Sequence, residues 1–168
     1  MIDPRSASGT DESDTNANAN ANANANANAN ANANANVEPT PPAATPFERL
    51  GGERGVRALV DRFYDLMDLE PAAADLRALH PATLDDSRNK LFWFLCGWLG
   101  GPNHYIERFG HPRLRARHLP FAIGIAERDQ WLGCMVQAMA EQAVDPALAQ
   151  RLAEHFFGTA DWLRNQGG

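Results

Sequence analysis

The sequence predicts an all-α domain behind a low-complexity leader. Apolar residues recur at helical spacing in four segments, strand-like alternation and hairpin turn pairs are absent, and Gly and Pro separate the helical segments. A strict Asn-Ala alternation over residues 16–36 and a Pro- and Ala-rich stretch over 37–46 have almost nothing to bury. We therefore expect a disordered leader over residues 1–46 and one domain over 47–168, which is long enough for a single core.

The domain is expected to begin at a capping box. In Thr45-Pro46-Phe47-Glu48, Pro takes the first helical position and Glu the third. After Gly51-Gly52, the spacing of the apolar residues predicts an amphipathic helix that begins near Glu53. Its inner face consists of Val56, Leu59, Val60, Phe63, Tyr64 and Met67. A short helical segment is expected over 72–79, between Pro71 and Pro81.

The second principal helix is expected to begin at a cap formed by Asp85 or Asp86. Apolar residues cover more than half of its surface, which is typical of a helix packed on more than one side. A Gly-Gly-Pro sequence at 100–102 ends it.

The stretch over 103–124 differs in kind, because Gly and Pro break it into pieces of one or two turns. It is polar but interrupted by apolar residues, so we expect it to be packed. Long irregular segments in compact domains are usually functional or disordered, and this one is predicted to wrap something. Regular helix is expected to resume near Ile125, and Asp145-Pro146 is expected to start a fourth principal helix.

Charge and cysteine content exclude several classes of protein. The net charge is −6, of which the leader carries −4 and the domain only −2, so a role in binding nucleic acid or an anionic membrane is not expected. No apolar run is long enough to cross a bilayer, and the first residues do not resemble a secretory signal. Cys96 and Cys134 lie in apolar helical patterns, which is typical of reduced, buried thiols in a cytoplasmic protein.

The five histidines are the main candidates for chemistry. Their spacing matches neither zinc sites nor the paired Glu-x-x-His repeats of di-iron bundles, and no nucleophile elbow supports a Ser-His-Asp triad. A single histidine as axial ligand of a haem iron remains open, and so does the commoner role of a hydrogen-bonded structural residue. The surplus of large apolar side chains and the polar tips of Tyr64 and Trp131 favour haem, although each is also compatible with an ordinary core.

Two ordered motifs resemble the group II truncated haemoglobins. They are RFGHPRLRARHLPF over 108–121 and ERDQWLGCM over 127–135, and they are accompanied by Arg62-Phe63-Tyr64 and by Gly-Gly pairs at 51–52 and 100–101. The resemblance covers residues 47–168 and none of the leader. It implies a truncated globin fold, a two-over-two helical sandwich that encloses a b-type haem.

The resemblance also implies roles for particular residues. His118 corresponds to the proximal iron ligand, and Tyr64, Trp131 and His80 correspond to distal positions that face bound ligand. Ser87 corresponds to the position where longer globins keep a distal histidine. The remaining haem contacts are implied for the apolar wall of Leu91 and Phe94, for Phe121, and for Lys90 and Arg117 as partners of the propionates.

The function implied is reversible binding of dioxygen or another diatomic ligand. Two hydrogen bonds from distal donors would slow release by about 10²-fold or more, which favours chemistry or sensing over bulk oxygen transport. A haem peroxidase or NO dioxygenase is the alternative; because no flavin or nicotinamide motif is present, it would need a separate reductase. A cofactor-free helical interaction module is the third hypothesis, and the sequence leaves the oligomeric state open.

Overall fold

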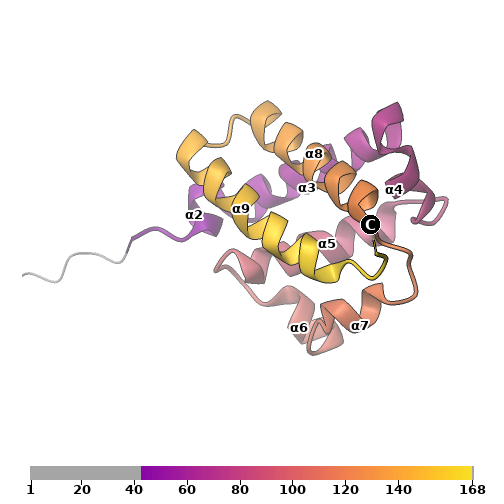
Figure 1. Cartoon of the computed structure of the whole chain (residues 1–168). Coiled ribbons are helices and arrows are strands. Elements are labelled where there is room, and N and C mark those ends of the chain that lie inside the picture. Colours follow the sequence, from indigo (N-terminus) through magenta and orange to yellow (C-terminus); the bar gives the residue numbers. More distant parts are fainter. Residues whose placement is uncertain (1–42, 168) are drawn as a thin grey trace, which may run out of the picture. The chain divides into compact units, whose positions relative to one another are not determined.

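The structure is a computed structural model that describes residues 43–167. The predicted disordered leader lies, up to Pro42, outside the described residues. Within them the protein is helical and contains no strand, which confirms the predicted all-α class (Figure 1). The elements are α2 (Pro46–Arg49), α3 (Gly52–Leu69), the 3-10 turn η1 (Pro71–Ala73), α4 (Ala74–Ala78), α5 (Asp85–Trp98), α6 (His104–Phe109), α7 (Leu114–His118), α8 (Ile125–Glu141) and α9 (Pro146–Leu163).

Four long helices form two layers, with α8 and α9 crossing over α3 and α5 (Figure 1). Helix α3 is the centre of the core, because it packs against both α5 and α8, while α8 also packs against α9. The inner face predicted for α3 is buried: Val56, Val60 and Phe63 have no exposed surface, and Tyr64 is 6% exposed. The predicted two-over-two helical sandwich is therefore confirmed.

The capping box at the start of the domain is also confirmed. The hydroxyl of Thr45 accepts a hydrogen bond from the backbone N–H of Glu48 at 3.2 Å, and the carboxylate of Glu48 accepts one from the backbone N–H of Thr45 at 2.8 Å. Helix α2 then packs onto the end of α5, where the Phe47 ring lies against Gly101. A side chain at this position would clash, because an added Cβ would lie 2.5 Å from the ring. Gly101 is thus required for close packing as well as for the turn.

The expected cap of α5 is wrong. Leu84 is the N-cap, and Asp85 is the first helical residue; neither Asp85 nor Asp86 caps the helix with its side chain. Leu84 is only 7% exposed, so its burial in the core fixes the point where the chain enters the helix. The two carboxylates lie in the first turn instead, where negative charge is favourable near the helix N-terminus.

The irregular stretch over 103–124 contains two short helices, α6 and α7. Helices α6 and α7 lie together at one side of the two layers (Figure 1). Helix α6 packs against α5, whereas α7 packs mainly against α9. The predicted last helix is confirmed, because Asp145 caps α9 by accepting a hydrogen bond from the N–H of Leu148 at 2.9 Å.

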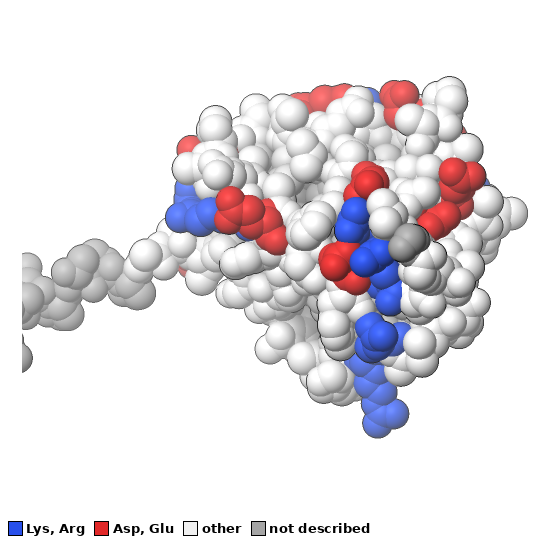
Figure 2. All heavy atoms as spheres, viewed as in Figure 1, with Lys and Arg blue, Asp and Glu red and all other residues white. Residues whose placement is uncertain are grey.

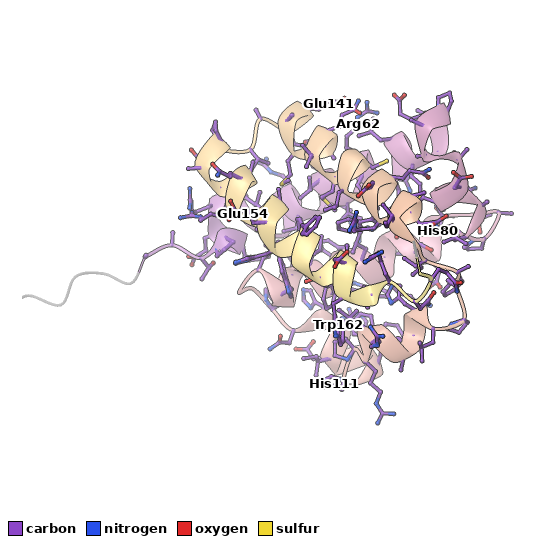
Figure 3. The ribbon with its side chains drawn as sticks, viewed as in Figure 1. Arg62, His80, His111, Glu141, Glu154 and Trp162 are labelled. Carbon is purple, nitrogen blue, oxygen red and sulfur yellow. The ribbon has the colours of Figure 1, made fainter. Side chains whose placement is uncertain are left out.

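Ion pairs join the helices at the surface. Arg62 of α3 pairs with Glu141 of α8 (Figure 3), and Arg88 of α5 pairs with Asp65 of α3 at 2.6 Å. Between residues 43 and 167, no helix has the length and apolar character required to cross a membrane.

Candidate functional site

His118 is the last residue of α7 and is half-buried. Its Nδ1 lies 2.7 Å from the carbonyl oxygen of Leu114, one turn earlier in the same helix, so Nδ1 carries the proton and donates it to that carbonyl. This tautomer leaves a lone pair on Nε2, which has no hydrogen-bond partner among residues 43–167. A histidine held in this way presents Nε2 as a metal ligand.

Tyr64 projects from the middle of α3 and is almost fully buried. Its ring meets the His80 imidazole edge to face, with the ring centroids 5.9 Å apart. Burial raises the pKa of the Tyr64 phenol, while the Ser87 hydroxyl and the nearby Arg88 guanidinium act in the opposite direction. The phenol therefore stays protonated and is available as an O–H donor.

His80 follows α4 and is half-buried, and its Nδ1 lies 3.0 Å from the carbonyl oxygen of Leu76. Burial lowers the pKa of this imidazole and the charge of Arg77 lowers it further, while the hydrogen bond with the Leu76 carbonyl acts in the opposite direction. The ring is therefore neutral near pH 7, with Nδ1 protonated and Nε2 free.

Trp131 lies on α8, where its ring contacts those of Phe63 and Phe156 at centroid distances of 5.1 and 5.5 Å. Its indole N–H has no partner among the described residues. Because no buried side-chain polar atom in this part of the chain lacks a partner, that N–H is not sealed inside the core. It faces accessible space and can donate to a ligand there.

Three apolar side chains of the predicted haem contacts are partly exposed. Leu91 and Phe94 of α5 pack against the core but are only partly buried. Phe121 follows α7 and is 42% exposed. An imidazole Nε2 without a partner, partly exposed apolar side chains and the polar groups of Tyr64, His80 and Trp131 are the kinds of group that a planar, largely apolar macrocycle with a central metal requires. The residues present therefore fit a haem.

The predicted propionate partners have other contacts. Lys90 forms an ion pair with Asp86 at 2.6 Å on the same helix, and Arg117 donates to the carbonyl oxygen of Pro112 at 3.0 Å. In the described residues neither cation contacts another predicted site residue. Both are exposed, so both remain free to reorient towards an anionic group.

The structure adds residues that the sequence did not single out. An open surface hollow of about 410 Å³ lies where the end of α3 meets α4, and it brings Met67, Glu70 and Arg77 beside His80. Asn165, just beyond α9, donates hydrogen bonds to the carbonyl oxygens of His118 and Phe121. No local pattern marks Asn165, because its partners lie more than forty residues earlier in the chain.

No three-residue metal cluster accompanies this region. Within residues 43–167, no group of three or more His, Cys, Asp or Glu side chains converges. The candidate metal ligand is therefore a single histidine.

The comparisons with known proteins agree on one family. The family profile described as bacterial-like globin matches residues 45–165. Among curated proteins, the group 2 truncated haemoglobin YjbI of Bacillus subtilis is 38% identical over 121 residues, which span 72% of this chain and 89% of the relative.

Solved structures give the same result. The group II 2-on-2 haemoglobin of Agrobacterium tumefaciens is 44% identical with a TM-score of 0.73, and the match covers 76% of this chain and 99% of that one. The cold-adapted truncated haemoglobin of Pseudoalteromonas haloplanktis is 43% identical with a TM-score of 0.72, covering 74% and 100%. A truncated haemoglobin of Bacillus subtilis that is described as oxygen-avid is 36% identical with a TM-score of 0.67, covering 73% and 100%.

Proposed function

The chain belongs to the bacterial-like globin family as a group II truncated haemoglobin, and from that premise we propose that it binds dioxygen and other diatomic ligands reversibly, with His118 as the axial ligand of a haem iron. When bound, the haem would be held by His118 and would supply an iron that binds the diatomic ligand. The observation that carries the proposal is the 2.7 Å separation of the His118 Nδ1 and the carbonyl oxygen of Leu114, which commits Nδ1 as a donor and leaves Nε2 as the candidate metal ligand. The Leu114 carbonyl also makes the imidazole a stronger ligand.

The distal donors determine how long the ligand stays. Tyr64 offers a protonated phenol and Trp131 an indole N–H, and both lie on helices that pack into the core. A hydrogen bond to a partly negative diatomic ligand contributes about 1–3 kcal/mol. Two such bonds slow release about 10²-fold. We therefore propose a tight oxygen binder, like the relative described as oxygen-avid, suited to sensing or ligand chemistry more than to delivery.

We propose that the haem is of the b type and that the protein works in the cytoplasm. Both cysteines are free thiols, and both are buried in the core. Cys96 is 0% exposed and Cys134 is 6% exposed, so neither is placed to form a thioether bond to a cofactor. Free thiols are typical of reducing compartments.

The test compares two histidines of the same segment in the full-length protein. The wild type is expected to show an intense Soret band that shifts when carbon monoxide is added to the reduced form. His118→Ala should lose the axially ligated spectrum. His111→Ala is the matched control, since His111 is exposed and its Nδ1 only accepts a hydrogen bond from the N–H of Arg113 at 3.1 Å (Figure 3).

Two results would contradict the proposal: a wild type that takes up no haem, or a His118→Ala variant with an unchanged spectrum. The first result would select a cofactor-free interaction module. The second would assign the axial ligand to another residue.

We propose a haem peroxidase or NO dioxygenase as the second function. The observation that favours it is the edge-to-face contact of the Tyr64 and His80 rings, because such polar groups beside a bound ligand would polarise an O–O bond. Turnover of peroxide well above that of free haemin would support it, and the loss of that turnover in Tyr64→Phe would assign the role to the phenol. Rates no greater than those of free haemin would leave ligand binding as the function.

A further inference from the structure

The position of His118 depends on contacts made by its short helix. Helix α7 has five residues, too few to be stable alone, and it packs mainly against α9. The residues that hold α7 and the following loop to the end of α9 therefore decide where the imidazole points.

Asn165 makes four hydrogen bonds to that loop. Its side-chain Nδ2 donates to the carbonyl oxygen of Phe121 at 2.7 Å and to that of His118 at 3.2 Å. Its Oδ1 accepts from the N–H of Ile123 at 3.0 Å, and its own backbone N–H donates to the carbonyl oxygen of Ile123 at 3.0 Å. One residue thus fixes the chain at three points between His118 and Ile123.

The loop needs such a partner. The carbonyl of His118, at the end of α7, accepts one turn hydrogen bond from the N–H of Phe121 at 3.1 Å, and Asn165 adds a second. The carbonyls of Phe121 and Ile123 lie in irregular backbone, where regular secondary structure supplies no partner. A primary amide carries two N–H donors and one carbonyl acceptor in a plane. Asn165 uses all three functions, which no carboxylate, hydroxyl or apolar side chain of similar size can do.

A second contact ties the other part of α7 to the same end of α9. The guanidinium of Arg115 donates to the carbonyl oxygen of Trp162 and lies 5.5 Å from the centroid of the Trp162 ring. Figure 3 shows Trp162 below the end of α9, on the side where α6 and α7 lie. Helix α7 is therefore held to the end of α9 near its start by Arg115 and at its last residue by Asn165.

We propose that Asn165 is the positioning residue of His118. By holding the His118 carbonyl and the loop after it, Asn165 fixes the direction of Nε2 relative to α5. The inference rests on the proposed function, in which Nε2 binds the haem iron. It assigns to the C-terminal segment a part in haem retention and in the orientation of the axial bond.

The test uses the haem-loaded, full-length protein with two substitutions. Asn165→Asp keeps the acceptor for Ile123 but replaces both Nδ2 donors with a carboxylate that faces two carbonyl oxygens. Asn165→Ala removes donors and acceptor together. We expect transfer of haem to excess apomyoglobin to be about tenfold faster or more in both, and the iron–imidazole stretching band in the resonance Raman spectrum to shift. In Asn165→Ala, the amide of Ile123 should also exchange its hydrogen about tenfold faster.

Gln142→Glu is the matched control, because it makes the same amide-to-carboxylate change at an exposed residue just after α8, which makes none of the hydrogen bonds that hold the loop over 118–123. It should leave haem transfer and the Raman band as in the wild type. Unchanged haem transfer, Raman band and hydrogen exchange in both Asn165 variants would overturn the inference. A failure of the proposed function would give a different result. The wild-type chain would take up no haem, whereas Asn165→Ala would still make the Ile123 amide exchange its hydrogen faster.

Discussion

At the scale of single residues, the proposed function makes ligand retention depend on Tyr64 and Trp131. Both carry a polar group on an aromatic ring that packs against the core. We predict that Tyr64→Phe and Trp131→Phe each accelerate oxygen release by roughly tenfold, because each removes about one hydrogen bond. Dissociation rates measured by rapid mixing with dithionite test this.

Tyr105→Phe is the matched control for the loss of a phenol. Tyr105 is also buried, at 8% exposed, but it lies on α6 against Phe94 and Phe109. Its substitution should leave the dissociation rate unchanged. If the Tyr64 and Trp131 variants release oxygen no faster than this control, the distal assignment is wrong.

The pKa of Tyr64 also predicts how stability varies in alkali. Burial raises this pKa above the ordinary value of 10.0, so the native state keeps a proton that the unfolded state releases. The contribution to the free energy of unfolding is complete below that value and is lost as the pH rises above it. Tyr64→Phe should therefore lose less stability than the wild type between about pH 9 and pH 11, measured by urea unfolding. Equal losses in the two proteins would mean that Tyr64 ionises in the native state as freely as in water.

The sequence predicts residues best where their signals are local. The capping box at Thr45 and the inner face of α3 follow from spacing alone, and both are confirmed. The assignments of His118 and Tyr64 came from motif resemblance, and they stay predictions that the geometry supports. Asn165 was missed because its role depends on contacts with residues more than forty positions away, which no periodicity reveals.

At the scale of helices, two helical glycines differ in how much space surrounds them. A Cβ at Gly55 in α3 would lie 1.7 Å from the carbonyl oxygen of Leu50, so backbone would have to move. Gly133 in α8 is exposed, and a Cβ there would meet nothing within 4 Å. We predict that Gly55→Ala destabilises the protein by about 1–3 kcal/mol, whereas Gly133→Ala stabilises it by about 0.5–1 kcal/mol.

Chemical denaturation of the two glycine variants checks this contrast. Both substitutions replace a helical glycine with the same residue, so helix propensity alone predicts the same sign for both. A stabilising Gly55→Ala would show that α2 and α3 are not held as closely as the structure has them. Such contacts explain why helix positions can be predicted from the sequence while the approach of one helix to the next cannot.

At the scale of the whole molecule, the core lies within residues 43–167. The buried residues of α3, α5, α8 and α9 form one continuous cluster. The domain boundary was predicted after residue 46, but the first structured contacts include Thr45, whose hydroxyl caps α2. The boundary stays a prediction, and the capping box gives a way to test its position to within a few residues.

Two shortened chains should differ in stability although both keep Phe47 against Gly101. A chain that begins at residue 43 retains Thr45, Pro46 and the capping box, and we predict that it matches the full-length protein in haem absorption and in thermal unfolding. A chain that begins at residue 47 loses the cap and the proline at the first helical position. Loss of such a cap costs about 0.5–2 kcal/mol, so its unfolding temperature should be lower by several degrees. If the two shortened chains unfold at the same temperature, the cooperatively folded unit begins at Phe47. If both lose haem binding, the site needs the leader.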